Sequence, residues 1–122
     1  MKYAALLTNH ADAVAEWEKL SPEEAAAARA EEVPKWEALF SELGQSGVLG
    51  AGFELDSPKT AKIVRVRGGE TIVTDGPFAE TKEQIGGLLE LEAEDLDAAI
   101  AIAARIPVAL RASVELRPVI EH

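Results

Sequence analysis

Asp75 is the side chain whose type and setting most clearly permit chemistry, because it joins an apolar run to the turn sequence Asp75-Gly76-Pro77. Glycine reaches backbone angles that other residues avoid, and proline fixes its own φ, so this sequence predicts a turn. An aspartate at such a position accepts hydrogen bonds from the amides that follow, which would hold it ionised. The same carboxylate, directed into a pocket, would act as a general base or anchor a ligand. The sequence leaves both interpretations open.

His10 and Arg65 are the side chains that we consider as partners of Asp75. His10 follows the first predicted strand, where side chains often project into a cleft, and its imidazole changes charge near neutral pH. We therefore name Asp75 and His10 as candidate catalytic residues, with a solvent-facing loop position as the alternative for His10. Arg65 lies between two valines. Its guanidinium would bind Asp75 or an anionic ligand, or else lie solvated on a sheet face.

The sequence offers no pattern for a metal ion or a cofactor. It contains no cysteine and two histidines, of which His122 is the last residue. Carboxylates are then the main remaining ligands, and their spacing matches no familiar metal site. Gly86-Gly87 lacks the lysine and the helix that follow a phosphate-binding loop. We expect neither a metal nor a cofactor.

The charge of the chain argues against two classes of partner. With 22 acidic and 12 basic residues the formal net charge is −10, which repels phosphate backbones and anionic membranes. We therefore expect no binding to nucleic acid or to a membrane. No apolar run approaches the ~20 residues of a membrane-spanning helix, and no signal-peptide pattern is present. Together with the absence of cysteine, this favours a soluble cytoplasmic protein with one domain over residues 1–122.

Two helical segments are predicted after a first strand near the N-terminus. Asn9 would cap a helix over residues 11–20. The sequence Ser21-Pro22-Glu23-Glu24 is a strong start signal for the second helix, with a serine N-cap, an early proline and the glutamate of a capping box. Pro34 lacks an amide donor, so we expect a kink there or two helices meeting just before it.

The residues that position Asp75 are predicted to form a β-hairpin. Residues 62–67 and 70–74 read as two strands around Gly68-Gly69, which suits a type I′ turn. This hairpin would place Asp75 at the end of its second strand. Residues 79–84 then favour a short helical turn before another strand.

The order of predicted elements indicates an α+β fold. Strands are expected near residues 48–55, 85–92 and 113–120, and Asp95 would cap a helix before the last strand. This order predicts an antiparallel sheet with helices on one face. The other face would be uncovered in a single chain, so we expect it to pack against a second copy in a homodimer.

The run from Asp75 to Gly87, DGPFAETKEQIGG, resembles the signature of the bacterial DGPF-domain proteins, a branch of the YCII-related family. The resemblance implies a ferredoxin-like α+β fold whose dimer forms an α/β barrel. It implies no settled activity or substrate. Further matches extend through most of the chain: Met1-Lys2-Tyr3, Leu20-Ser21-Pro22-Glu23-Glu24, Val64-Arg65-Val66, Leu96-Asp97-Ala98-Ala99 and Ser113-Val114-Glu115-Leu116-Arg117-Pro118.

Four more side chains are candidates for ligand contacts. Tyr3 and Phe78 would line an apolar pocket or else fill the core. Glu80 and Lys82 belong to the signature, and they would bind a ligand or else form a local ion pair that stabilises the turn.

Three hypotheses about function follow. The first is a small dimeric pocket protein that acts as a cofactor-independent acid–base enzyme on a small organic molecule, with Asp75 working beside His10 or Arg65. The second is a non-catalytic ligand-binding or regulatory module. Genes for DGPF-domain proteins often lie beside those for extracytoplasmic-function sigma factors, so the resemblance implies a setting in sigma-factor-controlled transcription. The third is a protein whose dimer surface is its whole function.

Overall fold

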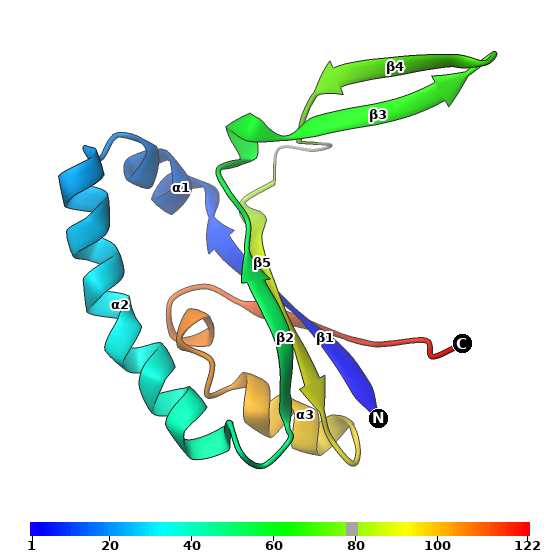
Figure 1. Cartoon of the computed structure of the whole chain (residues 1–122). Helices are drawn as coiled ribbons and strands as arrows, with labels where there is room; N and C mark the ends of the chain where they lie inside the picture. Colours follow the sequence, from blue (N-terminus) through cyan, green and yellow to red (C-terminus); the bar gives the residue numbers. More distant parts are fainter. Residues whose placement is uncertain (78–80) are drawn as a thin grey trace.

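The computed structural model describes residues 1–77 and 81–122, and its main feature is an antiparallel sheet (Figure 1). The sheet contains β1 (Lys2–His10), β2 (Leu49–Glu54), β5 (Glu83–Glu92) and β6 (Val114–Pro118). They lie in the order β2-β5-β1-β6, and every neighbouring pair is antiparallel. This is the ferredoxin-like order, which confirms the predicted α+β class. The described sheet of one chain is open, so the barrel expected of the dimer stays a prediction.

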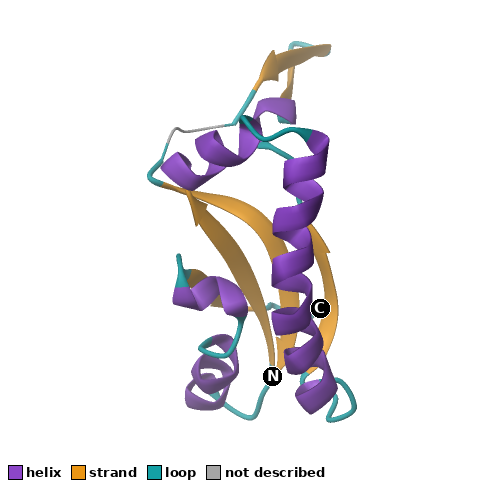
Figure 2. Cartoon of the chain, turned by 90° about the vertical axis from the view of Figure 1, so that its left-hand side faces the viewer, coloured by secondary structure: helices purple, strands orange, loops and turns teal. Residues whose placement is uncertain are grey.

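Helices cover one face of this sheet. Within the described residues they are α1 (Ala11–Glu18), α2 (Pro22–Leu43) and α3 (Leu96–Ala103), with short 3-10 turns η1 (Pro58–Thr60) and η2 (Pro107–Leu110). Figure 2 shows α2 running along the sheet with α3 beside its lower end. None of the described helices is long and apolar enough to cross a membrane.

The second helix begins where the capping box predicts. Ser21 Oγ accepts from the Glu24 amide at 3.1 Å, and Glu24 Oε1 accepts from the Ser21 amide at 3.0 Å. Pro34 lies inside one continuous helix, so the alternative of two separate helices is wrong. Pro34 and Ala30 are both exposed, so the turn of α2 in which Pro34 removes an amide donor lies at the surface.

Pairing with β1 overrides two local predictions. The first strand extends to His10, whose backbone is the N-cap of α1 without a capping bond from its side chain, so Asn9 is a strand residue rather than the cap. Glu83 and Gln84 belong to β5, opposite His10 and Asn9, and not to a helical turn. Sheet pairing with a neighbouring strand outweighs the weak helix propensity of such a short run.

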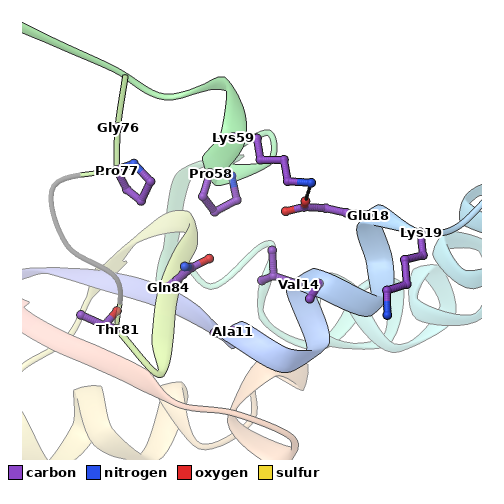
Figure 3. A pocket seen from close by; sticks show the side chains of 11 residues that line it. Ala11, Val14, Glu18, Lys19, Pro58, Lys59, Gly76, Pro77, Thr81 and Gln84 are labelled. Atoms are coloured by element: carbon purple, nitrogen blue, oxygen red, sulfur yellow. Dashed lines mark ion pairs between the residues drawn. The ribbon is translucent and has the colours of Figure 1, made fainter. Parts of the chain in front are cut away.

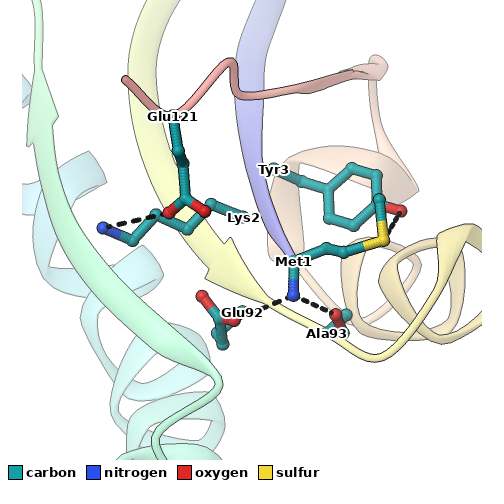
Figure 4. Close-up of polar contacts among 6 residues, drawn as sticks. All are labelled: Met1, Lys2, Tyr3, Glu92, Ala93 and Glu121. Carbon is teal, nitrogen blue, oxygen red and sulfur yellow. Dashed lines mark hydrogen bonds and ion pairs between the residues drawn. The ribbon is translucent and has the colours of Figure 1, made fainter.

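The core lies between the sheet and α2 and α3. At one edge of the core, the N-terminal amine of Met1 donates hydrogen bonds to Glu92 Oε1 and to the Ala93 carbonyl oxygen, at 2.9 Å each (Figure 4). Leu89 and Leu91 point inward, as the strand pattern predicts. The buried apolar residues are Tyr3, Ala5, Leu39, Leu89, Leu91, Ala93, Ala99, Ala103, Ile106 and Val108.

The opposite face of the sheet is not covered by the described helices. Leu6 and Phe53 both pair with Leu88, which follows the alternation away from the buried Leu89. Phe53 is 60% exposed. We call the row Leu6, Phe53 and Leu88 the open face.

The predicted hairpin forms a separate sheet of two strands, β3 (Lys62–Arg67) and β4 (Glu70–Asp75). It projects from the rest of the chain (Figure 1). Gly68 and Gly69 have φ of 57° and 80°, which confirms the positive φ that a type I′ turn needs. We call residues 62–75 the hairpin arm.

Candidate functional site

Asp75 lies at the root of the hairpin arm and is paired with Lys62. The two residues are direct register partners, and Lys62 Nζ donates to Asp75 Oδ1. The Asp75 side chain is 83% exposed. The hydrogen bond from Lys62 lowers the pKa of Asp75 below its ordinary value, so the carboxylate is ionised at neutral pH.

The register of the arm separates Arg65 from Asp75. Lys62 pairs with Asp75 and Arg65 pairs with Ile72, so Arg65 is three residues from Lys62 along β3. Since successive strand side chains point to opposite faces, Arg65 lies on the face of the arm opposite Asp75. His10 is exposed at the junction of β1 and α1. The described partner of Asp75 is therefore Lys62.

A pocket of about 540 Å³ lies beside the root of the arm (Figure 3). Its floor comes from α1 and the start of β5, and its outer wall comes from η1 and Gly76-Pro77. The side chains of Pro58, Pro77 and Gln84 converge on this space in Figure 3. The lining residues are Ala11, Val14, Ala15, Glu18, Lys19, Pro58, Lys59, Gly76, Pro77, Thr81 and Gln84.

Backbone contacts join the segments that form the outer wall. The Gly76 amide donates to the Ala61 carbonyl oxygen at 2.9 Å, which ties the two ends of the arm together. The Ala61 amide in turn donates to the Pro58 carbonyl oxygen at 3.1 Å. The Gly76-Pro77 part of the signature is thereby positioned over α1, with a cis peptide bond between the two residues.

One ion pair lies at the rim of the pocket. Glu18 Oε2 is 2.6 Å from Lys59 Nζ, and Glu18 Oε1 accepts from Ser57 Oγ at 3.0 Å. The Glu18 side chain is 15% exposed, whereas that of Lys59 is 79% exposed. The hydrogen bond from Lys59 lowers the pKa of Glu18. Burial opposes this to a smaller extent, and the hydrogen bond from Ser57 lowers the pKa further. This pair connects α1 to η1 across the pocket.

Gln84 supplies an unpaired polar group. Among the buried side-chain nitrogen and oxygen atoms of the described residues, Gln84 Oε1 is the atom that lacks a hydrogen-bond partner. Leaving such an atom unpaired costs about 1–3 kcal/mol. Rotation of the terminal amide exchanges its oxygen and nitrogen, so this group can present either an acceptor or a donor to a bound molecule.

The remaining predicted ligand residues lie in different settings. Tyr3 is 2% exposed in the core, outside the pocket lining. The Lys82 carbonyl oxygen accepts from the Ala11 amide at 2.7 Å, which fixes the backbone at the pocket floor. Phe78 and Glu80 lie outside the described residues. In the parts of the chain that are described, no three His, Asp or Glu side chains come together to hold a metal ion.

Sequence reasoning did not single out Val14, Glu18, Lys59 or Gln84 as site residues. Gln84 belongs to the signature run, and this position in the sequence could have identified it as a site residue. Val14 and Glu18 are four residues apart on α1, a spacing that places them on one face of a helix. Nothing local in residues 57–59 indicates that they approach α1.

Comparison with known proteins agrees with the family that the signature run predicts. The model of the YCII-related domain matches residues 1–122. An uncharacterized protein of Rhizobium meliloti (strain 1021) is 34% identical over 100 residues, which cover 82% of this chain and 75% of the relative. This chain therefore belongs to the YCII-related family.

Proposed function

We propose that this protein is a homodimeric small-molecule-binding module whose site is the pocket between α1, η1 and Gly76-Pro77. One observation carries the proposal: the signature turn contributes Gly76 and Pro77 to the pocket, while Asp75 of the same turn faces solvent beside Lys62. The most specific part of the sequence thus builds a cavity wall. Of the functions considered, ligand binding is the one that this arrangement supports best.

The setting of Asp75 argues for binding over acid–base catalysis. A general base works best when its pKa lies near the operating pH, which usually requires burial or a nearby like charge. Asp75 is highly exposed, and its pKa is lowered by Lys62. It is therefore a weak base at neutral pH, and its described contact stabilises the root of the arm.

The pocket suits a small, largely apolar organic molecule. Its volume of about 540 Å³ lies in the range of roughly 300–1,000 Å³ that is usual for small-molecule sites. Val14, Pro58 and Pro77 supply apolar walls. Glu18 and Lys59 neutralise each other at the rim, and Gln84 offers one uncharged polar contact. A neutral ligand with a single polar group matches this lining.

The open face supports the homodimer part of the proposal. Phe53 is largely exposed there and lies in one row with Leu6 and Leu88. Leu6 and Leu88 are half-buried, and an apolar row that is partly exposed on a sheet is a common site of protein contact. A symmetric pair of such faces would bury both rows at once.

A screen of neutral small-molecule fragments by ligand-observed NMR tests this function. Ala15 lines the pocket, so Ala15→Phe should fill it and abolish binding of the fragments that bind the wild-type protein. Ala27 is exposed on α2 outside the pocket, so Ala27→Phe is the matched control and should bind them as the wild type does. Fragment binding that survives Ala15→Phe would contradict the proposal.

A further inference from the structure

The hairpin arm exposes apolar side chains that a single chain leaves in water. Val64 and Val73 are direct partners across the two strands, and Val66 lies two residues from Val64 on the same face. They are 62%, 57% and 60% exposed, respectively. We call these three side chains the valine face. An isolated two-stranded hairpin is at best marginally stable in water, so an arm of this composition requires a surface to cover it.

The surface area of the chain indicates how much is uncovered. The described chain exposes 8568 Å². A compact monomer of 13.0 kDa is expected to expose about 6,300 Å², which leaves an excess of roughly 2,200 Å² per chain. Two chains that buried this excess against each other would form an interface of roughly 4,400 Å², within the range of obligate dimers. The excess is therefore of the size that a second copy would cover.

Charge also favours a second copy as the occupant. The arm carries three basic and two acidic residues, whereas the whole chain carries 12 basic and 22 acidic ones. An arm that lies on the body of another copy therefore brings a weakly basic segment onto an acidic surface. A strand of six residues spans about 20 Å, which is enough to cross a sheet of four strands.

We propose that the hairpin arm of each protomer packs its valine face against the body of a second copy, so that the two chains clasp each other. In a two-fold dimer both arms make the same contact, which doubles the buried apolar surface. No valine face is then left uncovered to bind a third copy. The arm is then an interface element in addition to the open face. This inference goes beyond the binding function proposed above.

The clasp would also fix the outer wall of the pocket, a consequence that rests on the proposed function. The outer wall of the pocket, Pro58, Lys59, Gly76 and Pro77, lies directly at the two ends of the arm. A partner that fixes the arm therefore fixes this wall as well. Fragment binding and dimer formation should strengthen each other, since each stabilises the same arrangement of the arm root.

Hydrogen exchange of the unmodified protein tests the clasp without any mutation. At concentrations where the protein is dimeric, amides of residues 62–75 should be protected from exchange. On dilution to the monomer, their protection should fall while that of β1 and β5 largely persists. An arm that exchanges rapidly at every concentration would overturn the proposal, as would a wild-type protein that is monomeric throughout.

A double variant tests the valine face itself. Val64→Glu with Val66→Glu should convert the dimer to a monomer in light scattering, with an unchanged far-ultraviolet circular dichroism spectrum. Leu110 is 85% exposed on η2, and Leu110→Glu is the control that should stay dimeric. A double variant that dimerises as the wild type does would overturn the clasp.

Weaker fragment binding by the monomeric double variant would support the coupling between the clasp and the pocket, and unchanged binding would refute that coupling alone. Absence of any fragment binding to the wild type would refute the proposed function but not the clasp.

Discussion

Lys62 and Asp75 face each other across the root of the hairpin arm, and the Lys62 ammonium donates to the Asp75 carboxylate. This hydrogen bond lowers the pKa of Asp75. Lys62→Ala should therefore raise the pKa of Asp75 toward its ordinary value of 3.8, as measured by carbon-detected NMR titration of the carboxyl group. Lys59→Ala is the matched control and should raise the pKa of Glu18 instead. A wild-type Asp75 that titrates above 3.8 would contradict this assignment.

The ion pair of Glu18 and Lys59 should make stability depend on pH. The pKa of Glu18 is lowered on folding, so its carboxylate contributes stability that is fully present above its ordinary value of 4.5 and is lost as the pH falls through the lower folded value. Glu18→Gln should lower the urea midpoint at pH 7, and the difference from wild type should shrink as the pH falls below 4.5.

Glu16→Gln is the control for this effect. Glu16 lies on the same helix with its side chain 75% exposed. Its replacement should change the urea midpoint little at either pH. A loss in Glu18→Gln that is the same at pH 7 and at pH 3 would refute the role given to the carboxylate.

Two adjacent glycines in the signature should differ in their tolerance of alanine. A Cβ on Gly87 would lie 2.9 Å from the Phe53 carbonyl oxygen, a backbone atom of the neighbouring strand. Gly87→Ala should therefore destabilise the fold by about 1–3 kcal/mol in urea unfolding. A Cβ on Gly86 would meet the end of the Asn9 side chain, which can move, so Gly86→Ala should cost less than about 1 kcal/mol. Equal losses would show that the close approach of β2 and β5 is not the cause.

Removal of the capping box should weaken α2. Ser21→Ala deletes the acceptor of the Glu24 amide and should lower the free energy of unfolding by about 1 kcal/mol. Ser41 is exposed inside the same helix, and alanine is the better helix former there, so Ser41→Ala should be neutral or slightly stabilising. Thermal unfolding of both variants would check the difference, and equal melting temperatures would count against the capping bond.

Local chemistry made much of the fold predictable. The capping box at Ser21, the N-cap at Asp95 and the turn at Gly68-Gly69 each depend on residues within a few positions of one another. Pro34 shows the limit of such reasoning. The cost of a helical proline depends on whether the freed carbonyl is open to water, and that exposure is set by tertiary packing.

The candidate site was less predictable because its parts come from distant segments. The pocket combines α1 with residues 58–59, 76–77, 81 and 84, and no local pattern shows that these segments meet. The partner of Asp75, in contrast, could have been predicted from the sequence. Counting outward from the two-residue turn places Lys62 opposite Asp75 and puts Arg65 on the other face of the arm.

The side-chain amide signal of Gln84 in a nitrogen–proton NMR spectrum offers the most direct test of the proposed pocket. Gln84 lines the pocket and its Oε1 lacks a partner there. Addition of a neutral fragment that binds should shift this signal together with the backbone amides of Ala15 and Thr81, and Gln84→Leu should weaken the binding. Shifts confined to Asp75, Lys62 and His10, with Gln84 unaffected, would contradict the proposal and would favour the acid–base enzyme hypothesis with Asp75 as the catalytic residue.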